Sequence, residues 1–332
     1  MSDVNMNKNL LIFIFFTGLA QAEENKNSCI EIPESDLWFD QTQAYISESV
    51  CSSAVWFDHF FANERDESEN VNRYIRLTTT AGYRKVEGFD SNVRLSGRIE
   101  FPNVKKKLHL LLESEQDKDA MDVLSQGNQV THLLNKNNTN KSNSVGLRWD
   151  VSQQANSAFS MNVGLRFNKT INLRLQGRYR YTYPLEEDSL IRLTQSVFWE
   201  GNEGVGENTR VDVEKLLASQ TLLRFSQNLG VSEVSKGKEW LSEVALFHHF
   251  TKEKAGALTF WLSGATKPTD NISGLEETGF SLRYRQSFYR PWLFFEIEPH
   301  YRWVRKEFTR DYQPSPGIIA RVEIQFGYKH DQ

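Results

Sequence analysis

The sequence has no long uninterrupted run of apolar residues, although 39% of its 332 residues are hydrophobic. A helix that crosses a bilayer needs about 18 or more such residues in a row. The apolar stretch near the N-terminus is shorter than that, and nothing after it comes close. We therefore exclude a bundle of membrane-spanning helices, while the length is compatible with one large domain or two small ones.

An excess of basic charge is also missing. Lysine and arginine together number 39 against 43 for aspartate and glutamate, which gives a net charge of -4. Nucleic acids are bound through clustered basic residues, so we predict no nucleic-acid partner. Glycine clusters such as "GNEGVG" at residues 201–206 lack the spacing of a phosphate-binding loop, so they predict turns and we expect no cofactor.

Residues 1–22 predict a secretory signal peptide. Lys8 precedes an apolar core at residues 10–19, and residues 20–22 have the sequence "AQA", a cleavage site of the A-x-A type. A membrane anchor is the alternative, but the apolar core is short for one. We expect an exported protein.

Cysteine is scarce, since Cys29 and Cys51 are the two in the sequence. Export brings a chain into an oxidising compartment, where an even pair of cysteines favours a disulfide over a catalytic or metal site. We predict a disulfide between Cys29 and Cys51, and two unpaired thiols are the alternative.

Most of the remaining sequence alternates between apolar and polar side chains. In "SNVRLSGRIEF" at residues 91–101, Val93 and Ile99 alternate with Arg94 and Arg98. Successive side chains of a β-strand point to opposite faces, so this pattern predicts strands with one apolar and one polar face. No convincing helical pattern separates these strands, which disfavours a parallel β-α-β arrangement.

The strands suit a membrane barrel better than a soluble sandwich. Sandwich strands usually have about five or six residues, whereas several alternating runs here reach ten or more, as strands that cross a bilayer at a tilt require. The polar face favours Arg, Glu, Asp, Ser and Asn over Lys. Aromatic residues lie near the run ends, where interfacial girdles occur: Tyr183, Trp199, Trp292, Trp303 and Tyr328.

We predict an all-β fold, an antiparallel transmembrane β-barrel of about fourteen strands, with twelve to sixteen possible. The alternating runs begin near residues 73, 91, 105, 143, 157, 171, 188, 208, 221, 238, 255, 278, 292 and 315. With both termini in the periplasm, short segments such as "ASQ" and "YRP" become periplasmic turns, and residues 117–142 form a long external loop. Residues 239–264 fit least well because apolar residues fall on both faces.

The signal sequence, the amphipathic runs and the final run "ARVEIQFGY" together resemble a Gram-negative outer-membrane β-barrel over residues 73–328. The resemblance implies a place in outer-membrane lipid and insertion by the barrel-assembly machinery, which reads a last strand of this kind. Such chains commonly stop at a terminal aromatic residue, whereas here Tyr328 is followed by a tail at residues 329–332.

If the apolar set faces lipid, the charged set faces the interior. A lipid-facing arginine near the midplane costs about 2–4 kcal/mol, and the planar guanidinium can bind carboxylates through two hydrogen bonds. These side chains could orient solutes in an open channel or form ion pairs that fill a closed barrel. We expect the following residues to line the lumen: Arg94, Arg98, Arg148, Arg166, Arg174, Arg178, Arg180, Arg192, Arg283, Arg285, Glu296, Glu298 and Arg302.

Residues 23–72 predict a helical segment ahead of the barrel, in the periplasm or in the barrel mouth. A long stretch of it contains no Gly or Pro, and Trp56, Phe57, Phe60 and Phe61 share one helical face. That face must be buried, either against the barrel as a plug, at a membrane interface, or against a periplasmic partner.

Three functional hypotheses follow. The first is a passive channel for small polar or anionic solutes through the arginine-lined lumen, and the second is a non-conducting structural or interaction barrel. An outer-membrane hydrolase is the weakest, with His300 as the inward-facing histidine to test, and we predict no enzyme. His248 and His249 are adjacent in a strand and point to opposite faces, so we expect no metal site there.

Overall fold

The structure is a computed structural model. It describes residues 53–54, 56–58, 60–61, 73–100, 108–116, 142–153, 156–167, 171–186, 188–201, 204–233, 238–266, 274–305, 309 and 311–326. The predicted signal peptide at 1–22, the cysteine pair Cys29 and Cys51, and the tail at 329–332 lie outside these residues.

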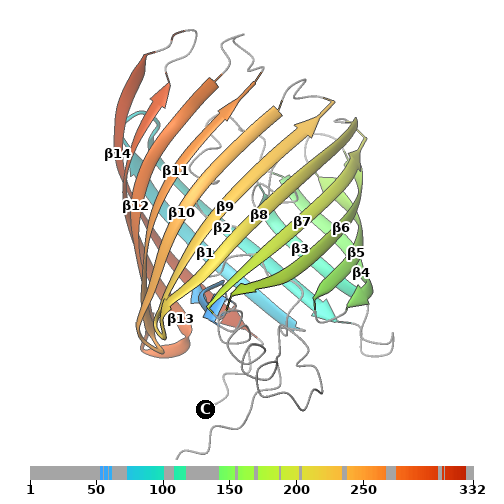
Figure 1. The fold of residues 1–332 in the computed structure, drawn as a ribbon, viewed down its shortest axis with the longest axis horizontal. Coiled ribbons are helices and arrows are strands. Elements are labelled where there is room, and N and C mark those ends of the chain that lie inside the picture. The colour runs from blue at the N-terminus through green and yellow to red at the C-terminus, as the bar shows by residue number, and fades with distance from the viewer. Residues whose placement is uncertain are drawn as a thin grey trace, which may run out of the picture.

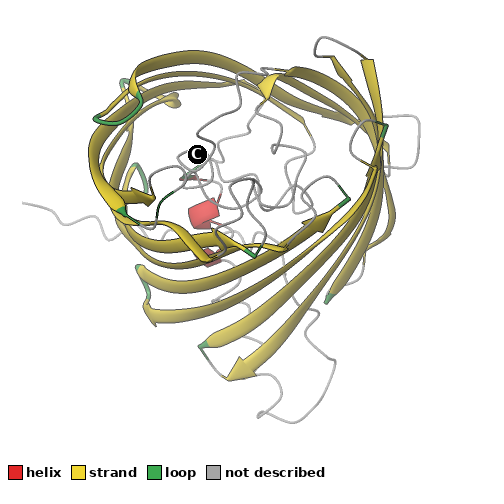
Figure 2. Cartoon of the chain, turned by 90° about the horizontal axis from the view of Figure 1, so that it is seen from above, coloured by secondary structure: helices red, strands yellow, loops and turns green. Residues whose placement is uncertain are grey.

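Fourteen antiparallel strands form one closed barrel, which confirms the predicted fold class (Figures 1 and 2). The strands are β1 (Arg73–Arg84), β2 (Gly88–Glu100), β3 (Leu108–Gln116), β4 (Ser142–Gln153), β5 (Ser157–Phe167), β6 (Ile171–Glu186), β7 (Ser189–Glu200), β8 (Gly204–Ala218), β9 (Thr221–Ser232), β10 (Lys238–Thr251), β11 (Lys254–Ala265), β12 (Gly274–Phe288), β13 (Arg290–Arg305) and β14 (Tyr312–Phe326).

The barrel closes because the first and last strands pair with each other. The register between β1 and β14 runs from Ile75 opposite Phe326 to Arg84 opposite Gly317. Every other strand pairs with its neighbours in sequence, so the chain is an up-and-down meander. Closure means that each of the fourteen described strands has a neighbour on both sides, whereas an open edge strand would not be tolerated in a hydrocarbon environment.

Connection lengths differ between the two ends of the barrel. At the end where β1 begins and β14 ends, Tyr289 alone joins β12 to β13, and Ser219 and Gln220 join β8 to β9. The opposite end carries the long connection at residues 117–141 as well as short ones such as 168–170. We call these the turn end and the loop end. Among the described residues, no helix has the length and apolar composition needed to cross a membrane, a finding that does not bear on β-barrels.

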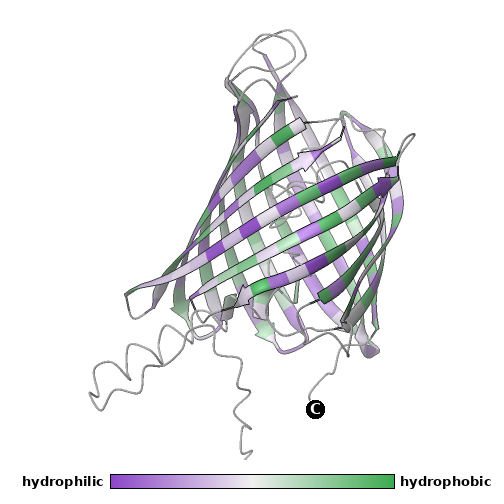
Figure 3. Cartoon of the chain, turned by 90° about the vertical axis from the view of Figure 1, so that its right-hand side faces the viewer, coloured by the Kyte–Doolittle hydropathy of each residue, from purple (hydrophilic) through white to green (hydrophobic). Residues whose placement is uncertain are grey.

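The alternating sequence produces two chemically different barrel faces. Exposed apolar side chains such as Val163, Phe260 and Leu282 lie on the outside, and the hydropathy of successive residues alternates along the strands (Figure 3). Their strand neighbours Arg166 and Arg283 are almost completely buried. An apolar exterior around a charged interior is the pattern of a transmembrane barrel.

The outer face provides a direct test of this architecture. Val163 lies near the middle of β5 and is 49% exposed. We expect Val163→Arg to lower the free energy of unfolding by about 2–4 kcal/mol, because the charge would enter the middle of the hydrocarbon layer. Urea titration of the refolded barrel in lipid measures the effect. The matched control, Phe167→Arg at the strand end, should cost about 0–1 kcal/mol, and equal costs at both positions would contradict the assignment.

Candidate functional site inside the barrel

The inner wall, meaning the strand side chains that face the interior, is charged and buried. Its described carboxylates are outnumbered by its arginines. The buried arginines are Arg76, Arg98, Arg148, Arg166, Arg174, Arg178, Arg192, Arg210, Arg224, Arg283, Arg285, Arg302 and Arg321, and the buried strand carboxylates are Asp150, Glu200, Asp212, Glu214, Glu243, Glu277, Glu296, Glu298 and Glu323. The structure thus buries all the residues expected in the lumen except Arg94 and Arg180, which are half-buried.

Several of these carboxylates and four of these arginines are outside the set of lumen residues expected from the sequence, namely Arg76, Arg210, Arg224 and Arg321. Arg210 and Arg224 were missed, although Arg210 alternates with Asp212 in β8, and Arg224 alternates with Ser226 in β9. Period-two spacing was therefore the signal that could have identified them.

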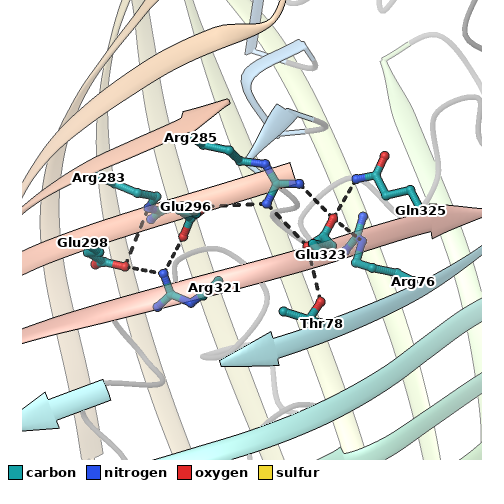
Figure 4. A network of polar contacts seen from close by, with 9 residues as sticks. All are labelled: Arg76, Thr78, Arg283, Arg285, Glu296, Glu298, Arg321, Glu323 and Gln325. Atoms are coloured by element: carbon teal, nitrogen blue, oxygen red, sulfur yellow. Dashed lines mark hydrogen bonds and ion pairs between the residues drawn. The ribbon is translucent and has the colours of Figure 1, made fainter. Parts of the chain in front are cut away.

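An ion-pair network joins the strands where the barrel closes (Figure 4). Glu323 on β14 accepts a hydrogen bond from Arg285 Nη2 at 2.8 Å and forms an ion pair with Arg76 Nε at 3.3 Å. Thr78 and Gln325 also donate to this carboxylate, at 3.3 and 2.7 Å. Because Arg76 belongs to β1 and Arg285 to β12, one carboxylate connects strands on both sides of β14.

A second cluster continues the network along β13. Arg321 donates to the Glu296 carboxylate and to Glu298 Oε2, the latter at 2.7 Å. Arg285 Nη1 lies 3.5 Å from Glu296, and Arg283 Nε lies 3.9 Å from Glu298. Predicted lumen residues of β12 and β13 therefore meet Arg321 of β14 at the closure of the barrel.

The wall formed by β4 to β7 is arginine-rich. Glu200 accepts hydrogen bonds from Arg166 Nη1 at 2.8 Å and from Arg174 Nη1 at 3.0 Å, and the Arg174 guanidinium lies over the Phe198 ring at 4.5 Å. Among the described side chains of these strands, Asp150 and Glu200 are the inward carboxylates. The inward arginines of the same strands are Arg148, Arg166, Arg174, Arg178, Arg180 and Arg192, and Arg192 also pairs with Glu214 of β8 at 3.9 Å.

A helical segment, the described residues within 53–61, packs on the inner wall near the turn end. The Phe61 N–H donates to the Phe57 carbonyl at 2.9 Å, a helical hydrogen bond. Figure 2 shows the segment within the ring of strands. Ala54, Phe57, Phe60 and Phe61 form one buried apolar cluster with wall residues, namely Leu190, Leu222, Ala245, Phe247, Ala255, Ala257 and Phe294.

Ring contacts hold the aromatic face of the segment in place. Phe57 and Phe61 lie 5.3 and 5.7 Å from the Phe247 ring, and Phe60 lies 5.9 Å from Phe294. Trp56 stacks on Phe60 at 4.8 Å. Such pairs are each worth about 0.5–1.5 kcal/mol beyond the area they bury.

A buried ion pair fixes the same segment. Asp58 accepts two hydrogen bonds from Arg224, at 2.6 Å from Nη1 and 3.0 Å from Nη2, and both side chains are buried. Arg224 Nε donates to Glu214 at 2.8 Å, so the guanidinium is shared between the segment and β8. The sequence analysis did not single out Asp58, although an acidic residue within the aromatic run "WFDHFF" was a signal that could have identified it.

One described histidine contacts an acid: His109 Nε2 lies 3.0 Å from Asp150 Oδ2, and both side chains are buried. Ser281 lies opposite His300 on the inner wall, but neither the Ser281 hydroxyl nor His300 Nε2 makes a hydrogen bond. His248 contacts the Thr221 hydroxyl, whereas His249 packs against Trp56. Within the described part of the chain, no group of three potential ligands could hold a metal ion.

Solved structures with a similar fold are outer-membrane channels and porins. The outer-membrane channel DcaP of Acinetobacter baumannii is 7% identical, with 77% of this chain and 96% of that chain covered and a TM-score of 0.47. An anion-selective porin from Comamonas acidovorans is 9% identical over 76% and 98% of the two chains, with a TM-score of 0.46. The NanC porin is 13% identical over 75% and 98%, with a TM-score of 0.35.

These likenesses concern the fold alone. No family model matches the sequence, and a search of curated proteins found no match. The location follows from the molecule itself, because a closed barrel with an apolar exterior and a charged interior is built for the outer membrane. The chain is an outer-membrane β-barrel of a Gram-negative bacterium.

Proposed function

We propose that the chain is a passive channel for small polar solutes, with a preference for anions, that is closed by its own helical segment. The observation that carries the proposal is the arginine-rich wall of β4 to β7, on which six inward arginines lie with the carboxylates Asp150 and Glu200 among the described side chains. A surface of one charge sign within low-dielectric walls concentrates ions of the opposite sign.

The closed state is supported by burial. Arg174 and Arg192 are 1% and 2% exposed, although the side chains lining a water-filled channel would be wetted. The helical segment also packs against the inner wall, through a cluster whose described strand residues come from β7, β9, β10, β11 and β13. We infer that release of this segment opens the route along the arginine-rich wall. The predicted Cys29–Cys51 disulfide would then restrain the chain just before the segment.

Selectivity tests the channel. We expect Arg174→Ala combined with Arg178→Ala to shift the reversal potential under a salt gradient toward cation preference, with the anion-to-cation permeability ratio reduced severalfold, because positive charge leaves the wall. Planar bilayer recording measures it. Lys254→Ala, at the exposed start of β11, is the matched control and should leave the ratio unchanged. A folded barrel that never conducts, even with the segment released, would reject the channel.

Burial of the wall also favours a second candidate, a non-conducting barrel whose segment binds a periplasmic partner. A photocrosslinker at Phe60 distinguishes the two. Phe60 packs on Phe294 of the same chain, so the plug predicts crosslinks to β13. Crosslinks to another protein in cells would support the partner.

A further inference from the structure

Polar side chains interrupt the apolar outer face of the barrel on four neighbouring strands. They are Gln195 of β7, Thr209 of β8, Gln227 of β9 and Ser242 of β10, and all four are half-buried. Each lies two positions from an exposed residue of its own strand, so all four point outward, away from the charged interior. We call this set the outer row.

The strand register makes the outer row continuous. Gln195 lies opposite Thr209, and Gln227 lies opposite Ser242. Val211, two residues from Thr209 on the same face of β8, lies opposite Gln227 and joins the two pairs. A hydrogen bond links each pair. The Thr209 hydroxyl donates to Gln195 Oε1, and the Ser242 hydroxyl donates to Gln227 Oε1, both at 2.5 Å.

The outer row lies midway between the two ends of the barrel. Gln195 and Gln227 are each the seventh of twelve residues in strands that begin at the turn end. The other outward carboxamides among the described strand side chains are Asn143, the second residue of β4, and Gln286, the third from the end of β12. Those two are near the membrane surface, whereas the outer row is in the hydrocarbon layer, whose lipid tails neither donate nor accept hydrogen bonds.

Gln195 has hydrogen-bonding capacity that its own barrel does not use. Gln227 Nε2 donates to the backbone carbonyls of Asn228 at 3.0 Å and Leu241 at 3.3 Å. Among the described residues, none accepts a hydrogen bond from Gln195 Nε2. Each glutamine oxygen can also accept a second hydrogen bond. Because a polar group left unpaired in hydrocarbon is costly, the outer row calls for a cover that both donates and accepts.

A second copy of the same barrel provides such a cover. A carboxamide carries both donors and acceptors, so it is complementary to itself. Two copies that insert in the same orientation can be related by a two-fold axis along the membrane normal. That axis keeps every residue at its own depth, so one outer row meets the other. Glu207, two residues before Thr209 on this face of β8, is exposed and lies toward the loop end, so the rows meet through uncharged groups.

We propose that the outer row is the centre of a two-fold interface between two copies of this chain in the outer membrane. Gln195 Nε2 of each copy donates to a glutamine oxygen of the other copy. The outward apolar side chains around the row, among them Val197, Val211 and Phe225, pack across the interface. Each barrel keeps its own lumen, so the inference is independent of whether the channel conducts.

The test is self-association of the full chain refolded in detergent, measured by sedimentation velocity over a range of protein-to-detergent ratios. We expect an equilibrium between monomer and dimer. Gln195→Leu combined with Gln227→Leu should raise the dissociation constant of the dimer about tenfold or more, because it removes the hydrogen bonds between the copies and leaves an apolar surface that lipid can cover. Gln286→Leu makes the same chemical change on β12, outside the outer row, and should leave the dissociation constant unchanged. Migration of the unheated protein on a gel reports that each variant is folded.

Photocrosslinking in outer membranes tests the same surface without detergent. A photocrosslinker in place of Val211, at the centre of the outer row, should yield a crosslinked dimer of this chain. The control position is Val93, which is 50% exposed on the outer face of β2, across the barrel from β8. It should yield no dimer.

Each outcome decides the proposal. A folded wild type that stays monomeric at every ratio and gives no crosslinked dimer from Val211 overturns it. A dimer that the double variant does not weaken, or that Gln286→Leu weakens equally, also overturns it, because another surface then holds the copies together. Crosslinks from Val211 to a different protein would assign the outer row to that partner and reject the two-fold interface.

Discussion

Asp58→Asn is expected to release the helical segment from the inner wall and to raise channel opening by about a hundredfold. The change removes one charge of a buried ion pair and leaves Arg224 with Glu214 as its remaining carboxylate partner among the contacts described above. Breaking such a pair costs about 3–5 kcal/mol. Since Arg224 still contacts Glu214 in the variant, we expect a cost at the lower end of this range, about 3 kcal/mol. That free energy corresponds to roughly a hundredfold change in the equilibrium constant between the docked and the released segment.

Single-channel recording measures the open fraction, and limited proteolysis within residues 53–61 reports release even if the barrel does not conduct. Asp188→Asn is the matched control. Asp188 lies in the exposed turn between β6 and β7, 3.5 Å from Lys215, and surface pairs of this kind contribute about 0–1 kcal/mol. If a folded Asp58→Asn barrel opens and is cleaved at the wild-type rates, the ion pair does not hold the segment.

Glu323→Gln is expected to destabilise the closure of the barrel by about 3–5 kcal/mol, because Arg76 and Arg285 lose the buried carboxylate they share. The effect should be large because this carboxylate joins β1, β12 and β14, and the pairing of β1 with β14 is what closes the sheet.

Urea unfolding in lipid measures this loss, and the temperature at which the compact band disappears on a cold-versus-heated gel gives a second value. Glu253→Gln, in the exposed turn between β10 and β11, makes the same chemical change outside the network and should have almost no effect. A stability loss as small as that of the control would mean that Thr78, Gln325 and the backbone hold the closure without the charge.

The sequence by itself determined the barrel and the charge of its interior. The alternation of apolar and polar residues can be read from each strand alone. In a bilayer the apolar side chains of each strand must face the lipid, so the polar side chains face the interior. For this reason the fourteen runs and the inward direction of residues such as Arg166 and Arg174 were predictable without knowledge of the fold.

The alternation of apolar and polar residues is irregular in the strands whose inner face is covered by the helical segment. Residues 239–264 looked irregular because apolar side chains fall on both faces, and the structure supplies the reason. Ala245, Phe247, Ala255 and Ala257 point inward and are buried in the cluster that contains the helical segment. The sequence predicted that the aromatic face with Phe57, Phe60 and Phe61 is buried, but it did not identify the strands against which this face packs.

The tertiary structure alone decided which charges meet. Asp58 and Arg224 are 166 positions apart, and Arg285 and Glu323 are 38 apart. An arginine with inward spacing can pair with any carboxylate that the closed barrel brings within reach, and that choice depends on register and closure. Local periodicity determines the face of a side chain, whereas its partner is determined by the packing of strands and segments distant in sequence.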